Sequence, residues 1–171
     1  KKLRRKSKSF EEGNYKEQIM AVHERWADVE YWRAIKRRAP SYSYSKYLKG
    51  VDMYQNEQGK LVQVVAGSIL DVAVDIRIGS PTFGKHHIVK LSSKNKKIFY
   101  IPEGFAHGYL VMSEFSIVLY KCTNIYNPND EYGIKWNDPD LNIEWGNKSP
   151  IISEKDNSLP FLKDQKHLPK Y

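Results

Sequence analysis

The sequence predicts a mainly β protein, an antiparallel sandwich or barrel, with a helical segment before it. From Lys60 onward, apolar residues recur with a period of two, which is typical of strands. Turn signals separate these apolar runs every ~8–12 residues, the spacing of short antiparallel strands. Between residues 10 and 39, by contrast, apolar residues recur at spacings of three and four, which is typical of an amphipathic helix.

The predicted helix lies in the first third of the chain, which holds all of the excess positive charge. Its apolar positions are Ile19, Val22, Trp26, Val29 and then Trp32 or Ile35, and Pro40 is expected to end it. Residues 1–50 hold 14 Lys and Arg against 6 Asp and Glu, whereas residues 51–171 hold 14 of each. Because residues 51–171 have no net charge, the chain is not a nucleic-acid-binding protein that is basic throughout. We expect the helix to lie on a partner surface, and binding of nucleic acid or another acidic surface is the less favoured alternative.

The composition limits the class of protein further. A chain of 171 residues suffices for one domain with a hydrophobic core. No apolar run approaches the ~20 residues of a transmembrane helix, and no apolar stretch follows the basic start as in a secretory signal. Cys122 is the single cysteine and lies in an alternating apolar run, so we expect a buried structural thiol. These features favour a cytoplasmic protein without membrane contact.

The strands can be placed approximately from the pattern. In LDVAVDIRI (70–78), Val72, Val74 and Ile76 are predicted to face one way, while Asp71, Ala73, Asp75 and Arg77 face the other. HHIVKL (86–91) and the run that begins IFYIP (98–102) predict further strands. GSPTFG (79–84) and SSKNKK (92–97) predict the turns between them. After residue 126, loops rich in Asn, Asp and Pro are expected to wrap the barrel.

One histidine and one tyrosine are predicted to meet. Two apolar runs flank Ser113-Glu114, and a hairpin with this two-residue loop would place His107 directly opposite Tyr120. Opposed residues on neighbouring strands have Cβ atoms about 4.5–5.5 Å apart on one face of the sheet. The hairpin therefore predicts a polar pair on the inner face of the barrel.

The string Pro102-x-Gly104-x-x-His107 resembles the second conserved motif of the cupins, which are small jelly-roll barrels. In metal-binding cupins, another motif supplies two histidines as His-x-His and a glutamate. Here the only close pair is His86-His87, and adjacent strand residues point to opposite faces. We therefore expect a cupin without a bound metal.

Five blocks together closely resemble the dTDP-4-dehydrorhamnose 3,5-epimerase family. They are GKLVQVVAGSILDVAVDIRIGSPTFGK, YIPEGFAHGYLV, VLYKCTNIYNP, GIKWNDPDLNIEW and PIISEKD, and they follow the family's order. The resemblance implies an antiparallel jelly-roll barrel over residues 48–164. The basic segment over 1–47, which the spacing predicts to be helical, precedes this barrel, and a tail over 165–171 follows it. It also implies a homodimer and a dTDP-sugar substrate.

The resemblance implies enolate chemistry on dTDP-4-dehydro-6-deoxyglucose in dTDP-L-rhamnose biosynthesis. Protons leave C3 and C5 beside the C4 ketone and return on the other face, and no cofactor is required because the ketone accepts the electrons. Tyr120 matches the proton donor, Lys60 the cation beside the enolate oxygen, and His107 a substrate contact. Glu131 and Lys155 match family positions that contact the nucleotide or the sugar. Tyr126 is expected either to stack on the nucleotide or to pack in the core or on the surface.

The match departs from the family at the residue that serves as the catalytic base. The family string Leu-Arg-Gly-Leu-His-Phe-Gln corresponds to LKGVDMYQ (48–55), so Lys49 replaces the arginine, Asp52 replaces the base histidine, and one residue is added. Lys49 cannot make the bidentate contact of arginine with a diphosphate. The aspartate that holds the family's base matches Asp156, so two carboxylates are expected together. Such a pair can share one proton and still act as a base.

The region before residue 45 lacks the family's first strands in this interpretation. A diverged relative with a new N-terminus, a decayed copy, and upstream sequence that is out of frame are three explanations that stay open. Two functions compete with the epimerase. One is a related sugar-nucleotide ketoisomerase or C3-epimerase. The other is an inactive cupin that binds a sugar nucleotide, or an acidic partner through residues 1–50.

Overall fold

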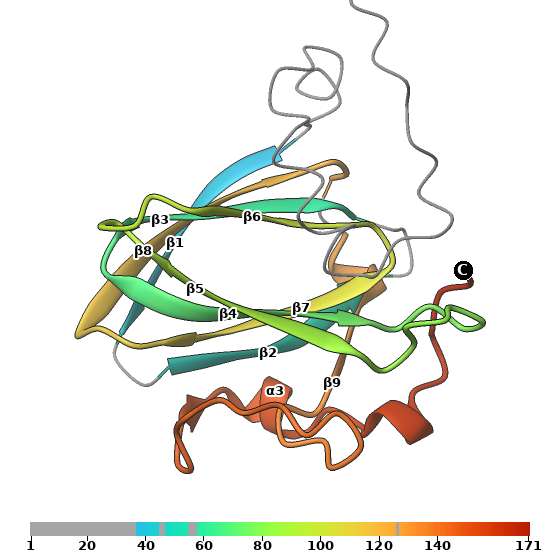
Figure 1. The fold of residues 1–171 in the computed structure, drawn as a ribbon. Helices are drawn as coiled ribbons and strands as arrows, with labels where there is room; N and C mark the ends of the chain where they lie inside the picture. Colours follow the sequence, from blue (N-terminus) through green and yellow to red (C-terminus); the bar gives the residue numbers. More distant parts are fainter. Residues whose placement is uncertain (1–36, 45–46, 55–57, 126) are drawn as a thin grey trace, which may run out of the picture.

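The computed structural model describes residues 37–44, 47–54, 58–125 and 127–171, and they form two β-sheets that face each other (Figure 1). Within these residues, sheet A has the strand order β1, β8, β3, β6. Sheet B has the order β10, β2, β7, β4, β5, and β9 pairs with β2 away from this path. The predicted mainly β fold with two opposed sheets is therefore confirmed.

The strand bounds follow the predicted runs from β3 onward. Sheet A consists of β1 (Arg37–Tyr44), β8 (Phe115–Cys122), β3 (Lys60–Ala66) and β6 (Ile98–Ile101). Sheet B consists of β10 (Ile151–Ile152), β2 (Tyr47–Tyr54), β7 (Phe105–Val111), β4 (Ser68–Asp75) and β5 (His86–Ser92), with β9 (Glu131–Ile134) beside β2. The turns predicted at GSPTFG and SSKNKK connect β4 to β5 and β5 to β6.

The sequence-based prediction of a helix up to residue 39 is wrong over residues 37–39. These residues begin β1, which pairs antiparallel with β8 from Arg37 opposite Cys122 to Tyr44 opposite Phe115. Pro40 lies inside this strand and does not end a helix. Among the described strands β1 is the edge of sheet A, a position where a proline is tolerated because it has no N–H to donate. The rest of the predicted helix lies outside the described residues.

The predicted hairpin between β7 and β8 is also wrong, because the two strands belong to different sheets. The connection between them is not a tight turn. The Ser113 side chain accepts a hydrogen bond from the Ser68 backbone at 2.8 Å and donates one to the Phe115 carbonyl at 2.6 Å. The loop is therefore fastened over the β3–β4 connection, and the chain crosses from sheet B to sheet A.

Both faces of sheet B are covered, which produces two hydrophobic clusters. The inner core lies between the sheets and contains Val62, Val64, Ile69, Ala73, Leu91, Phe99, Ile101, Phe105, Tyr109, Val111 and Val118. The outer core lies between sheet B and the chain after residue 130 and contains Leu48, Val51, Met53, Val72, Val74, Ile76, Ala106, Leu110, Ile134, Leu141, Trp145 and Leu162. The predicted alternation in β4 is confirmed, since Val72, Val74 and Ile76 enter the outer core and Ala73 the inner one.

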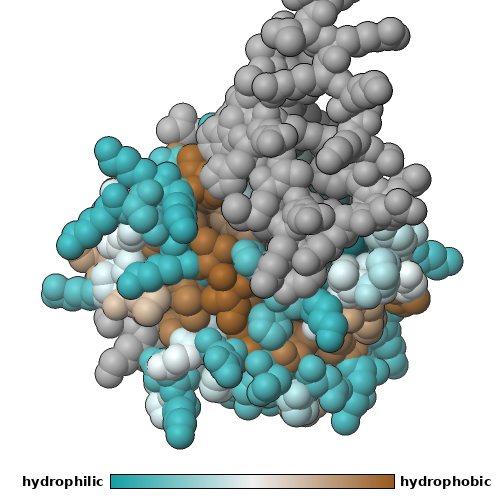
Figure 2. Space-filling view, viewed as in Figure 1, coloured by the Kyte–Doolittle hydropathy of each residue, from teal (hydrophilic) through white to brown (hydrophobic). Residues whose placement is uncertain are grey.

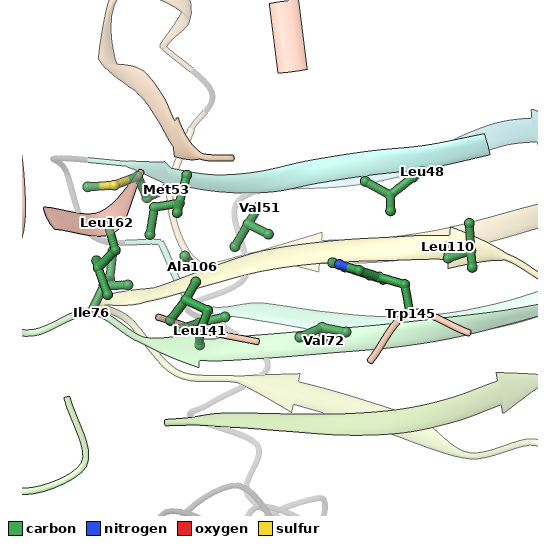
Figure 3. Close-up of a cluster of buried hydrophobic side chains, with 12 residues drawn as sticks. Leu48, Val51, Met53, Val72, Ile76, Ala106, Leu110, Leu141, Trp145 and Leu162 are labelled. Carbon is green, nitrogen blue, oxygen red and sulfur yellow. The ribbon is translucent and has the colours of Figure 1, made fainter. Parts of the chain in front are cut away.

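The C-terminal third consists largely of loops, as predicted, and these loops cover the outer face of sheet B. Figure 3 shows Leu141, Trp145 and Leu162 against side chains of β2, β7 and β4. The Trp145 indole donates a hydrogen bond to the Trp136 carbonyl at 2.8 Å. Asp138, which is buried, accepts hydrogen bonds from the backbone of Asp140, Leu141 and Leu162. The loops are thus fixed by hydrogen bonds as well as by apolar contacts.

Figure 2 shows hydrophobic side chains gathered at the opening between the two sheets of Figure 1, with hydrophilic residues around them. Among the described residues, no helix has the length and apolar character needed to cross a bilayer. Cys122 is buried, as the sequence predicts.

The outer core gives a stability prediction. Trp145→Ala removes a side chain that is only 4% exposed, and we expect it to lower the free energy of unfolding by about 3–5 kcal/mol. Ile125→Ala changes a side chain that is 71% exposed and should stay within about 0.5 kcal/mol of the parent. Urea unfolding followed by fluorescence measures both. Equal effects of the two substitutions would show that the loops do not depend on this core.

Candidate functional site

The inner face of sheet B carries a row of polar side chains from three adjacent strands. Asp71 of β4, His107 of β7 and Asp52 of β2 all point between the sheets, because each alternates with residues of the outer core. His107 lies directly opposite Asp52 in the register of β2 and β7. Its Nε2 atom is 2.6 Å from Oδ1 of Asp71, whose side chain is fully buried. The buried carboxylate of Asp71 thus fixes the orientation of the His107 ring by a hydrogen bond.

A bulge in β2 places Asp52 on this face. Lys49 pairs with Tyr109 and Asp52 pairs with His107, so the register shifts by one residue between them. In a regular strand, residues three apart point to opposite faces. The bulge at Gly50 and Val51 turns Lys49 and Asp52 to the same side. Gly108 faces the bulge across the sheet, and a Cβ there would lie 3.0 Å from the Lys49 carbonyl oxygen.

Asp52 is almost completely buried and is bound through one oxygen. Its Oδ2 atom lies 2.5 Å from Nζ of Lys49, whose side chain is 39% exposed. Its Oδ1 atom is buried and finds no hydrogen-bond partner in the described part of the chain. Burial raises the pKa of Asp52, and the positive charges of Lys49 and Lys60 oppose that shift without cancelling it. Asp52 therefore gives up its proton less readily than an ordinary aspartate.

Asp156 reaches the same strand from the outer side. It belongs to α3 (Glu154–Asn157), where the Ser153 side chain accepts a hydrogen bond from its backbone N–H. Its Oδ2 atom accepts a hydrogen bond from the Gly50 N–H at 3.0 Å. A Cβ at position 50 would lie 2.8 Å from Cγ of Asp156, so only glycine fits against this carboxylate.

The two carboxylates that the sequence places together bind different groups in the structure. Within the described residues, no hydrogen bond joins Asp52 and Asp156: the first binds Lys49 and the second binds the Gly50 backbone. Their charges still interact, since Asp156 contributes to the raised pKa of Asp52. Asp156 therefore supports the bulge that carries Lys49 and Asp52, while its carboxylate lies outside the row on the inner face.

Lys60 and Tyr120 face this row from sheet A. Lys60 begins β3 opposite Cys122 of β8, and it is 8% exposed. Burial lowers the pKa of Lys60, and the negative charge of Asp52 is the largest effect that opposes the shift. Tyr120 lies opposite Val62 in the same pair of strands and packs, half-buried, against the inner core. His107 and Tyr120 thus share the interior, although they lie on opposed sheets.

Glu131 and Lys155 form an ion pair at the end of β2. Lys155 Nζ lies 2.6 Å from Oε2 of Glu131, which is opposite Tyr54 in the register of β9 and β2. Partial burial lowers the pKa of Lys155, but the hydrogen bond and charge of Glu131 outweigh it and raise this pKa overall. Asp52 contributes to the same rise, so the pair belongs to the electrostatic surroundings of the site. Tyr126, which the sequence also suggests, lies outside the described residues.

The two adjacent histidines point to opposite faces of β5, as predicted. The ring of His87 lies 5.9 Å from the ring of Phe99 in the inner core. His86 lies on the side of the C-terminal loops, where burial lowers its pKa and the charge of Glu144 opposes that shift. The part of the chain that the structure describes contains no group of three or more His, Cys, Asp or Glu residues that could hold a metal ion.

Sequence reasoning did not single out Asp71 as a site residue. Its signal was present, since the alternation in β4 places an aspartate on the face opposite Val72, Val74 and Ile76. That pattern also fits a solvent-facing aspartate. It does not reveal that this face is enclosed, or that His107 lies on the next strand.

Comparisons with known proteins identify the family of the chain. The family model described as dTDP-4-dehydrorhamnose 3,5-epimerase matches residues 6–164, so the match begins well before residue 48. A dTDP-4-dehydrorhamnose 3,5-epimerase from Shigella flexneri is 50% identical over 120 residues, which cover 67% of this chain and 66% of that protein. The chain thus spans just under two thirds of that relative.

Two solved structures show the same fold. A dTDP-6-deoxy-D-glucose-3,5-epimerase from Legionella pneumophila Philadelphia 1, in complex with dTDP-4-keto-L-rhamnose, has a TM-score of 0.77 and 43% identity. The match covers 80% of this chain and 75% of that one. A 3'-monoepimerase from Streptomyces bikiniensis, in complex with dTDP-quinovose, has a TM-score of 0.78 and 30% identity, over 85% of this chain and 80% of that one. The family resemblance predicted from the sequence is confirmed.

The raised pKa of Asp52 gives a prediction for the pH dependence of stability. A carboxyl group whose pKa is higher in the folded state than in the unfolded state stabilises the fold only while it is protonated. The free energy of unfolding of the parent, relative to Asp52→Asn, should therefore decrease as the pH rises from about 4 through the folded pKa. Urea titrations of both proteins across this range measure it. A difference that grows with pH would show that Lys49 outweighs burial.

Proposed function

Because the chain belongs to the dTDP-4-dehydrorhamnose 3,5-epimerase family, we propose that it inverts C3 and C5 of dTDP-4-dehydro-6-deoxyglucose. The observation that carries the proposal is the arrangement of polar groups between the sheets. Lys60 and Tyr120 face inward from sheet A, and His107, Asp71 and Asp52 face inward from sheet B. A sugar ring held between the sheets would have titratable groups on both of its faces.

Inversion next to a ketone needs such a two-sided arrangement. Removal of the proton from C3 or C5 leaves an electron pair that delocalises onto the C4 carbonyl oxygen as an enolate. A proton delivered to the opposite face of the same carbon gives the inverted centre and restores the ketone. The substrate's own carbonyl accepts the electrons, so the proposed reaction needs no cofactor.

Tyr120 is the proton donor in this proposal. It packs against the inner core on β8, and the sheet that it belongs to faces the one that carries His107. A phenol is neutral at pH 7 because its ordinary pKa is about 10, so it carries a proton that it can transfer. Its half-buried position keeps the ring in place while part of it stays accessible.

Lys60 stabilises the enolate oxygen. Its side chain is buried on the inner face of β3, where an ammonium acts on a developing negative charge with little screening by water. Burial alone would favour the neutral amine, and the charges of Asp52 and Asp71 favour the ammonium. A negative charge on the substrate would add to the effect of the two aspartates.

Lys49, Glu131 and Lys155 are proposed to contact the nucleotide or the sugar. Lys49 is 39% exposed on the side chain and Lys155 is 53% exposed, so both present positive charge to solvent while each binds one carboxylate. A diphosphate could bind these two ammonium groups as point charges. Tyr126 belongs to the same proposal by family position alone.

A C3-epimerase or ketoisomerase, the alternative predicted from the sequence, is less favoured, because the family model and the Shigella flexneri relative carry the 3,5-epimerase name. A solved 3'-monoepimerase nevertheless has the same fold, with a TM-score of 0.78. Such an enzyme would exchange the proton at C3 alone. An inactive protein would bind the nucleotide and exchange neither proton.

The proposed homodimer would use exposed apolar side chains of sheet A. Val65 of β3 and Phe115 of β8 are 47% and 49% exposed on these adjacent strands. Large apolar side chains that stay exposed support an interface there.

Incubation with dTDP-4-dehydro-6-deoxyglucose in D₂O, followed by NMR, tests the epimerase directly. We expect the parent to incorporate deuterium at C3 and C5 with inversion. Tyr120→Phe should incorporate deuterium without inversion, because the base remains and the opposite proton donor is lost. Tyr132→Phe, whose ring stacks on His167 at 4.0 Å, is the matched control and should behave as the parent. Inversion by Tyr120→Phe at the parent rate would exclude the proposed donor.

The interface has a separate test. Phe115→Asp introduces a charge among the exposed apolar side chains of sheet A, and it should shift a dimer to monomers in sedimentation velocity, since burial of an unpaired carboxylate is unfavourable. Phe83→Asp, at a residue 40% exposed in the β4–β5 turn, is the control and should leave the dimer intact. A parent that sediments as a monomer would contradict the proposed assembly.

A further inference from the structure

We propose that His107, held by Asp71, is the general base of this chain in place of the histidine that Asp52 replaces. The inference rests on the proposed epimerase function and assigns the base within the same site. It follows from the contacts of three residues on the inner face of sheet B: Asp71, His107 and Asp52.

The bond between His107 and Asp71 fixes which nitrogen can accept a proton. The two side chains are joined through Nε2 and Oδ1 at 2.6 Å. A carboxylate oxygen accepts hydrogen bonds, so the tautomer with the proton on Nε2 satisfies Oδ1 of Asp71 and leaves a lone pair on Nδ1. Nδ1 takes no part in this bond, so it is the ring nitrogen left for a substrate. This is the arrangement of a base oriented by a buried carboxylate, which also stabilises the imidazolium once the base has accepted a proton.

Access distinguishes His107 from Asp52. The His107 side chain is 11% exposed, whereas that of Asp71 behind it is fully buried. Asp52 is 3% exposed on its side chain, its Oδ2 is engaged by Lys49 at 2.5 Å, and its Oδ1 is buried. A base must come within hydrogen-bonding reach of the proton that it removes. The His107 side chain is the more exposed of the two, while Asp52 must first break its ion pair or turn its buried oxygen outward.

The sheet topology supplies the stereochemistry. His107 lies on β7 in sheet B and Tyr120 on β8 in sheet A, and both face the space between the sheets. A ring bound between them would meet the imidazole on one face and the phenol on the other. Removal on one face and delivery on the opposite face is the condition for inversion. Had β7 and β8 formed a hairpin, both groups would have approached from a single sheet.

The proton balance closes with these two residues. Nδ1 of His107 takes the proton from C3 or C5, the C–H electron pair becomes a C=C bond to C4, and the carbonyl π electrons move to oxygen. The enolate then re-forms the ketone as the phenol of Tyr120 delivers its proton to the other face. The cycle leaves an imidazolium and a phenolate, and exchange of a proton with water restores both.

The test compares His107→Gln with Asp52→Asn in the D₂O experiment. Glutamine can donate from its amide to Asp71, so the buried carboxylate keeps a partner while the basic nitrogen is lost. We expect His107→Gln to lose at least ~100-fold in deuterium incorporation at both carbons while it still binds dTDP, measured by calorimetry. Asp52→Asn should stay within about tenfold of the parent. His86→Gln, on the outer face of β5, is the matched histidine control.

A second variant keeps the test decisive if His107→Gln folds poorly. His107→Ala leaves space for a small base, and added imidazole should restore exchange in proportion to its concentration. Loss of exchange in Asp52→Asn, with exchange retained in His107→Gln, would assign the base to Asp52 and overturn this inference, while the epimerase function would stand. A parent that binds dTDP and exchanges neither proton would refute the function and the assigned base together.

Discussion

The bulge in β2 is the constraint on which the site depends. Two residues, Gly50 and Val51, occupy the space opposite the single residue Gly108, and this shifts every later side chain of the strand to the other face. Val51 and Met53 consequently enter the outer core, and Asp52 turns inward beside His107. The bulge has support on both sides. Gly108 leaves room for its carbonyls, and Asp156 binds the Gly50 N–H.

The two hydrophobic clusters explain why several charged side chains are tolerated between the sheets. Sheet B has an apolar cluster on its outer face, so the inner face need not supply all of the hydrophobic burial. Asp71 has a hydrogen bond from His107, and Asp52 has Lys49. Asp75 lies further along β4, where Arg77, Ser80 and Thr82 bind its carboxylate and lower its pKa although burial alone would raise it. Buried charge is costly unless it is paired, and each of these carboxylates has at least one donor.

Much of the fold was predictable because strands leave a periodic signal. The period of two located β3 to β8 and both connecting turns, and it assigned the faces of β4 correctly. The pairing of those strands was not predictable in the same way. Ser113-Glu114 resembles a short loop, but hydrogen bonds of Ser113 to Ser68 and Phe115 fasten it across two sheets. The spacing of apolar residues predicted a helix up to residue 39. Residues 37–39 form a strand instead, because pairing with β8, which no local pattern encodes, overrides that spacing.

The candidate site was only partly predictable. Motif positions identified His107, Tyr120 and Lys60, and all three face the interior. Spacing could not show that Asp52 binds Lys49, that Asp156 stays behind the strand, or that Asp71 is the partner of His107. These relations arise from the bulge and from pairing between distant strands. The sequence predicts that Asp52 takes the place of the family's histidine, and the three-dimensional arrangement is needed to say what such an exchange does to the chemistry.

The central claim is that the base and the acid approach the sugar from opposed sheets, and a crystal structure tests it most directly. The protein would be crystallised with a dTDP-hexose that lacks the 4-keto group and cannot react. The account predicts that Nδ1 of His107 and the Tyr120 hydroxyl lie on opposite faces of the ring, each about 3.5 Å from C3 or C5. A ring with both groups on one face, or with Asp52 Oδ1 in the place assigned to His107 Nδ1, would contradict it.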